Sequence, residues 1–187
     1  MAQGAAFFKL RVLTPAIEAA LPDIFAGIEL RAYPSLFYQF VHSNTPDPGQ
    51  PAIADLSFAL IDGPLLERDV EHIDGLREEI DWMWPSRALF VERGLGVVAL
   101  IGNSIVCRCT AEYISATMCG IGIETEAANQ GQGIATATAA RFVAQALRRG
   151  LRPCWECHRA NLASQRLAAK LGFTLLSEEP YRLGRFN

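Results

Sequence analysis

The chain has 187 residues, of which half are hydrophobic and a fifth are charged, a composition typical of a globular protein rather than a disordered one. Its formal net charge of -3 argues against non-specific nucleic-acid binding, which needs a basic face. No apolar run approaches the ~20 residues that span a bilayer, and the first residues lack the basic start and apolar stretch of a signal peptide. We therefore expect a cytoplasmic protein with no nucleic-acid partner and no membrane partner.

The first 52 residues carry few clear signals. Residues 7–13 alternate in polarity like a strand, and Thr14-Pro15 offers an N-cap and a first-turn proline for a helix that reaches about Leu21. Residues 43–51 are dense in turn formers and predict a loop or linker. We expect residues 1–52 to be an N-terminal segment, either separate from the domain at residues 53–187 or part of it.

The next region predicts a short strand and one helix. An apolar run at residues 56–61 is followed by a turn at Asp62-Gly63-Pro64. From Glu67 to Trp84 the apolar residues recur at helical spacing, and Pro85 ends the pattern. The stripe consists of Val70, Ile73, Leu76, Ile80 and either Met83 or Trp84.

The remaining chain predicts a mixed sheet with helices packed on it. Two strands, 95–101 and 104–113, are joined by the hairpin signal Gly102-Asn103, and a third follows at 116–125. The period then changes to that of helices, which end at Gly150 and Gly172. The later elements are a helix at 134–149, a strand at 152–158, a helix at 161–171 and a strand that begins at 173.

Five cysteines raise the question of a zinc site, because Cys107 and Cys109 form one close pair and Cys154 and Cys157 another. A spacing of three points the second pair to opposite faces of a strand. Neither pair encloses the Gly or Pro that the tight turn of a zinc knuckle uses. We therefore expect buried free thiols and no metal.

The loop between the third strand and the next helix carries the sharpest chemical signal. Gly131 and Gly133 remove side chains where the backbone enters the helix, whose first amides have no intrahelical partner and favour a phosphate group. A Walker loop is excluded because Gly-Lys-Ser/Thr is absent, and Thr136 stands where a dinucleotide fingerprint has its third glycine. By these residues alone, the loop is either a phosphate site or a tight strand-to-helix turn.

Residues 122–137, Gly-Ile-Glu-Thr-Glu-Ala-Ala-Asn-Gln-Gly-Gln-Gly-Ile-Ala-Thr-Ala, resemble the acetyl-CoA motif of the GNAT superfamily. Residues 161–173, Asn-Leu-Ala-Ser-Gln-Arg-Leu-Ala-Ala-Lys-Leu-Gly-Phe, resemble its second signature, an Asn that opens a helix ending in Gly-Phe. Ile-Glu-Thr at 123–125 and Arg-Pro-Cys-Trp-Glu-Cys at 152–157 are similar to the zwittermicin-resistance-like branch. The resemblance implies an α+β GNAT fold, with a mostly antiparallel sheet, helices on both faces and strands splayed around acetyl-CoA.

The resemblance also implies how acetyl-CoA is bound. Backbone amides of the loop would hold the pyrophosphate, and the strand before it would pair with the pantetheine arm. The implied cofactor-binding residues are Ile123, Thr125, Gln130, Gly131, Gln132, Gly133, Ile134, Ala135 and Asn161. For Asn161, a simple helix N-cap is the alternative. The chain departs from the family pattern at Ala128, where Gln or Arg is common, and at Ala168, where many members have a tyrosine that acts as an acid.

Acetyl transfer to an amine needs a group or a water chain that takes a proton from the nucleophile. Alternation places Gly120, Gly122 and Glu124 on one strand face, which would leave room for a ligand beside a carboxylate. Glu156 lies on the later strand. We expect Glu124 and Glu156 to line the cleft as candidate catalytic bases, the alternative being solvated or ion-paired carboxylates.

Together these features predict an N-acetyltransferase that moves the acetyl group of acetyl-CoA to a primary amine of a small molecule by direct attack. Two alternatives stay open: a non-catalytic acyl-CoA-binding protein, and a protein or peptide N-acetyltransferase. A homodimer is the candidate assembly.

Overall fold

A computed structural model describes residues 7–11, 14–41 and 49–185. Its centre is a seven-stranded sheet in which only one pair of neighbours, β7 and β8, is parallel. The mostly antiparallel sheet that the sequence predicted is thereby confirmed. The strands, in spatial order, are β4 (Leu56–Leu60), β5 (Gly96–Ile101), β6 (Ser104–Ile114), β7 (Met118–Thr125), β8 (Arg152–His158), β3 (Ser35–Phe40) and β9 (Phe173–Glu178).

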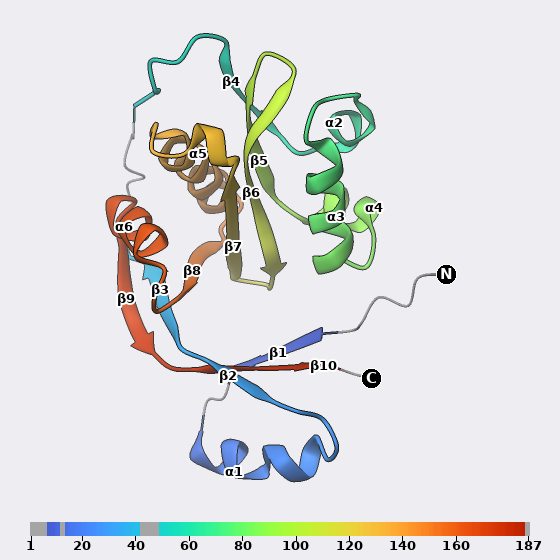
Figure 1. Ribbon diagram of the computed structural model, residues 1–187, viewed down its shortest axis with the longest axis vertical. Helices are drawn as coiled ribbons and strands as arrows, with labels where there is room; N and C mark the ends of the chain where they lie inside the picture. The colour runs from blue at the N-terminus through green and yellow to red at the C-terminus, as the bar shows by residue number, and fades with distance from the viewer. Residues whose placement is uncertain (1–6, 12–13, 42–48, 186–187) are drawn as a thin grey trace.

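Helices cover both faces of this sheet, as Figure 1 shows. Side chains of α5 (Ile134–Arg148) pack against one face, and those of α3 (Ile73–Met83) pack against the other. Val97 and Val98 are adjacent on β5 and belong to these two different clusters, because neighbouring residues of a strand point to opposite faces. The other helices are α2 (Gly63–Glu67), α4 (Arg87–Arg93) and α6 (Leu162–Lys170).

The single helix expected from Glu67 to Trp84 is wrong in its first turns. Asp62 caps a separate short helix, α2, because its carboxylate accepts a hydrogen bond from the Leu65 amide at 2.8 Å. The chain then leaves the helical conformation, and α3 begins only after His72, which has a φ of 65°. Val70 is buried between the two helices, so its place in the apolar stripe reflects burial rather than helical geometry.

A second, three-stranded sheet lies beside the main one in the order β1 (Phe7–Arg11), β10 (Tyr181–Arg185) and β2 (Arg31–Tyr33). We call it the small sheet. β2 runs on into β3 and β9 runs on into β10, with Pro34 and Pro180 at the bends, so that one two-stranded ribbon serves both sheets. Helix α1 (Pro15–Ile24) lies along the small sheet at the end of the molecule opposite β4 (Figure 1).

Two N-terminal expectations meet the described residues only in part. The expected strand at 7–13 is observed as β1, and its last two residues lie outside the described ranges. The expected loop at 43–51 also falls mostly outside them, and residues 49–51 have no regular structure. Helix α1 continues three residues beyond Leu21, and Thr14 caps it as predicted, since its hydroxyl accepts from the Ile17 amide at 3.3 Å.

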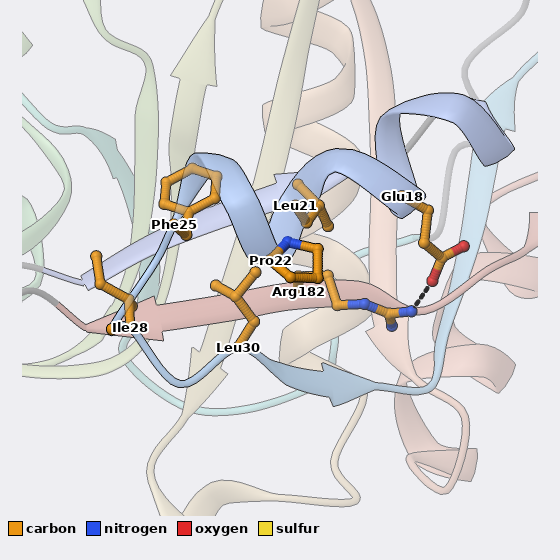
Figure 2. A pocket seen from close by; sticks show the side chains of 8 residues that line it. Glu18, Leu21, Pro22, Phe25, Ile28, Leu30 and Arg182 are labelled. Carbon is orange, nitrogen blue, oxygen red and sulfur yellow. Dashed lines mark hydrogen bonds and ion pairs between the residues drawn. The ribbon is translucent and has the colours of Figure 1, made fainter.

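A pocket of about 430 Å³ lies between α1 and β10, where Figure 2 shows apolar side chains gathered around Arg182. Arg182 forms an ion pair with Glu18 across this pocket. The lining residues belong to α1, to the turn after it and to β10. None of them comes from the loop at residues 126–133, which we call the glycine loop. None of the described helices is long and apolar enough to cross a membrane.

Candidate active site

The two parallel strands at the centre of the main sheet pair only over part of their length. Pairing runs from Met118 with Arg152 to Ile121 with Trp155 and then stops. β7 continues to Thr125 and stays paired with β6 on its other side, where Thr125 lies opposite Cys107. One edge of β7 from Gly122 onward is therefore not paired with β8, and an extended ligand has an open strand edge to bind.

The glycine loop follows directly after this open edge. A 3-10 turn, η1 (Ala127–Asn129), leads to Gly131 and Gly133, whose φ values of 75° and 83° lie in the left-handed region that favours glycine. The side chains of Gln130 and Gln132 form hydrogen bonds with backbone carbonyls that stabilise the loop. Their amides donate to the carbonyls of Thr125, at 3.1 Å, and of Ala128, at 3.2 Å.

Helix α5 starts at Ile134 and presents its N-terminus beside the open edge. The amides of a first helical turn have no intrahelical partner, and the helix dipole adds partial positive charge there. Among the described residues, no side chain accepts a hydrogen bond from the amides of residues 131–136, and Gly133, the N-cap, has no side chain of its own. This set of donors fits a pyrophosphate, and it stands next to the strand edge that fits an extended pantetheine chain.

The side chains of three expected cofactor-binding residues, Ile123, Thr125 and Ile134, are buried or half-buried. Ile134 is buried, and Ile123 packs against the core cluster under α5. The Thr125 hydroxyl donates to the Cys107 sulfur at 3.2 Å. These positions therefore offer backbone groups rather than side chains to a ligand.

Asn161 caps α6. Its Oδ1 accepts from the Ser164 amide at 3.0 Å, and the Ser164 hydroxyl accepts from Trp155 Nε1 at 2.9 Å. The capping interpretation of Asn161 is thus confirmed for its oxygen. A contact between its amide nitrogen and a cofactor stays a prediction.

Glu124 and Glu156, the two expected bases, belong to different ion-pair groups. The Glu124 side chain is 63% exposed and contacts Arg108, which also pairs with Glu79 at 2.5 Å and with Glu126 at 3.5 Å. The Glu156 side chain is only 20% exposed, and its Oε1 lies 2.5 Å from Lys9 Nζ of β1. Glu156 is also the residue directly after Trp155, the last residue of β8 that pairs with β7.

A third carboxyl, Glu112, was missed by the sequence reasoning. Its carboxyl group is largely buried, and this burial raises its pKa. The positive charge of Lys9 opposes the rise, and the negative charges of Glu156 and Glu79 add to it. The sequence held a partial signal, because Arg108, a threonine at 110 and Glu112 alternate along β6. Lys9 gave no such signal, since it reaches the site from the other end of the chain.

The expected open space over Gly120 and Gly122 is filled, and that expectation was wrong. A β-bulge in β6 places Tyr113 opposite Gly120, and a Cβ on Gly120 would lie 2.3 Å from the Tyr113 ring. A Cβ on Gly122 would lie 3.3 Å from Glu112 Cγ. Burial, with Cys154 and Glu156 nearby, raises the pKa of Tyr113 to about 12. The glycines thus make room for side chains of the same sheet.

Ala168 is fully buried in the group of apolar side chains that α5 and α6 form with the main sheet, which we call the main core cluster. No phenol group therefore projects from this position of α6.

The cysteines are free, and four of the five are buried. In the described part of the chain, no three His, Cys, Asp or Glu side chains are grouped so as to hold a metal ion.

Comparison with known proteins agrees with this architecture. The sequence model of GNAT acetyltransferases matches residues 54–182. YdfB, an uncharacterized N-acetyltransferase of Bacillus subtilis (strain 168), is 36% identical over 95 residues, which are 51% of this chain and 36% of that protein's length. The chain therefore matches little more than a third of this curated relative.

Solved structures share the fold at low sequence identity. A GCN5-related N-acetyltransferase-like protein from Streptococcus suis 89/1591 is 20% identical with a TM-score of 0.68, over 92% of this chain and 69% of that one. A putative acetyltransferase of the GNAT family from Novosphingobium aromaticivorans is 16% identical with a TM-score of 0.66, over 99% of this chain and 77% of that one. With its splayed strands, its glycine loop and a sequence match over most of its length, the chain belongs to the GNAT acetyltransferase family.

Proposed function

We propose that this protein transfers the acetyl group of acetyl-CoA to a primary amine of a small molecule, and that the amine attacks the thioester directly. The observation that carries the proposal is the open edge of β7, which leads straight into the glycine loop at the start of α5. Family membership supports acetyl-CoA as the donor. A small-molecule acceptor follows from the resemblance to the zwittermicin-resistance-like branch, which stays a prediction, as do a homodimer and a cytoplasmic location.

In this proposal, the backbone of the loop and of β7 binds the cofactor. Amides of Gln130 to Ala135 hold the pyrophosphate, the backbone of Ile123 to Thr125 pairs with the pantetheine arm, and the Asn161 side chain gives a further contact. The bound cofactor supplies the activated acetyl group. Because Ala128 replaces a longer polar residue of the family pattern, phosphate binding depends on the amides and the helix dipole.

Glu156 is the better supported of the two candidate bases. It lies at the point where β8 leaves β7, and its side chain is far less exposed than that of Glu124. A carboxylate at this point removes the proton that an attacking amine must lose. Glu124 is the weaker candidate, because its exposed carboxylate is already paired with Arg108.

A thiol-release assay with acetyl-CoA and a panel of small amines and short peptides tests the proposal. We expect release with small primary amines, and we expect Glu156→Gln to lower kcat by about 10²-fold or more, the usual contribution of a general base. Glu124→Gln is the matched comparison and should act more weakly. Release with peptides alone would favour a peptide acetyltransferase. Cofactor binding without release from any acceptor would favour an acyl-CoA-binding protein.

A further inference from the structure

The ammonium group of Lys9 lies where the two parallel strands separate. Lys9 belongs to β1, and its Nζ is 2.5 Å from Glu156 Oε1. The same Nζ lies 4.5 Å from the centre of the Tyr181 ring, which in turn stacks on Tyr33 at 5.3 Å. A primary amine of the chain itself is therefore held between a carboxylate and an aromatic ring, beside the point where β8 leaves β7.

The charge around this ammonium is not balanced. Glu112 lies over Gly122, where the open edge of β7 begins, since a Cβ on Gly122 would be 3.3 Å from Glu112 Cγ. The charges of Lys9 and Glu156 both act on its pKa, and no hydrogen bond or ion pair joins its carboxylate to the described residues. Arg108 of β6 already pairs with Glu79, Glu124 and Glu126. Arg11 of β1 lies over the Phe37 ring instead. Lys9 is thus paired with Glu156 beside a second acidic group, Glu112, and such a site favours a cation.

The contacts that hold Lys9 are of a kind that another amine can replace. Its side chain is 40% exposed, and β1 is an outer strand of the small sheet. Ion pairs that reach solvent contribute little to stability, and an ammonium over an exposed ring adds a similarly small amount. A carboxylate and a ring face together recognise any primary alkylammonium of suitable shape.

We propose that Glu156, Glu112 and Tyr181 form the subsite for the ammonium group of the acceptor, and that Lys9 occupies it as an internal competitor that the acceptor displaces. The inference rests on the proposed function and adds to it the chemistry by which the acceptor is recognised. An acceptor with a primary ammonium on a flexible, uncharged stem fits this subsite, and an acceptor with an anionic group next to its amine does not.

The test compares Lys9→Met with Lys170→Met, since Lys9 and Lys170 are the two lysines of the sequence and Lys170 lies exposed in the last turn of α6. We expect Lys9→Met to lower the KM for an active amine about five-fold, the factor that a weak ion pair is worth, while kcat changes less. Both variants should bind acetyl-CoA as the unchanged protein does. An unchanged or raised KM in Lys9→Met would overturn the inference.

A second measurement needs no turnover. Trace labelling with acetic anhydride, read by mass spectrometry, gives the ratio of modification at Lys9 to that at Lys170. We expect n-propylamine to raise this ratio, because it displaces Lys9 from Glu156, and n-propanol at the same concentration to leave it unchanged. If no amine gives thiol release and this ratio still rises, the proposed function fails and the ammonium subsite stands. A ratio that propylamine does not change would refute the subsite.

Discussion

At the scale of single residues, the site is built from carboxyl groups whose surroundings differ. Glu124 is exposed and ion-paired, Glu156 is half-buried against Lys9, and Glu112 is largely buried. The same residue type therefore has three electrostatic roles on neighbouring strands. The three carboxyl groups differ in how exposed they are to solvent and in whether a cation pairs with them.

Glu112 makes the fold sensitive to pH. Because burial raises its pKa in the folded state, the folded protein binds this proton more tightly than the unfolded chain does. The resulting stability is present below the ordinary glutamate pKa of about 4.3 and is lost as the pH rises through the folded value. We expect Glu112→Gln to be more stable than the unchanged protein at pH 7 and equally stable near pH 4. Urea unfolding at the two pH values measures this, and an equal gain at both would contradict it.

At the scale of elements, helix α6 begins at a residue with two proposed tasks. The Asn161 oxygen caps the helix, while its amide nitrogen is proposed to contact the cofactor. Asp is as good an N-cap as Asn but has no amide donor. We expect Asn161→Ala to cost about 1 kcal/mol of stability and Asn161→Asp to cost little. Both should weaken acetyl-CoA binding. If Asn161→Asp binds acetyl-CoA normally, Asn161 is a cap and nothing more.

The elements that the sequence predicted well are those with local signals. Gly102, Gly150 and Gly172 all have φ between 57° and 88°, and each ends an element where the sequence placed the end. The bulge that turns Tyr113 toward Gly120 has no such signal, because it depends on the register between two strands. For the same reason, the faces of β7 were assigned correctly while the side chains above its glycines were not foreseen.

At the scale of the whole molecule, the N-terminal segment completes the main sheet. β3 lies between β8 and β9 and is antiparallel to both. The strands β8 and β9 are therefore connected in the sheet only through β3, residues 35–40. This arrangement could not be predicted from the sequence, because β3 and its partners lie more than a hundred residues apart. A domain boundary at residue 53 stays a prediction, and the position of β3 argues that the domain needs the segment before that boundary.

Leu36 tests the contribution of β3. It is buried in the main core cluster, so Leu36→Ala is expected to destabilise the protein by about 2–5 kcal/mol. Ile24, which is exposed on α1, is the control, and its change to Ala should alter stability by no more than about 0.5 kcal/mol. Denaturant unfolding should show one transition that shifts as a whole. A separate early transition with an unshifted main one would mean that the segment folds independently.

The central claim is that the glycine loop and the open edge of β7 bind acetyl-CoA, and calorimetric titration tests it most directly. Gly133→Ala and Gly102→Ala both place a side chain at positive φ, but only Gly133 lies in the loop. We expect acetyl-CoA and CoA to bind the unchanged protein and Gly102→Ala alike, and to bind Gly133→Ala at least about ten-fold more weakly, a loss of about 1.4 kcal/mol. No binding by the unchanged protein, or equal binding by all three, would contradict the account.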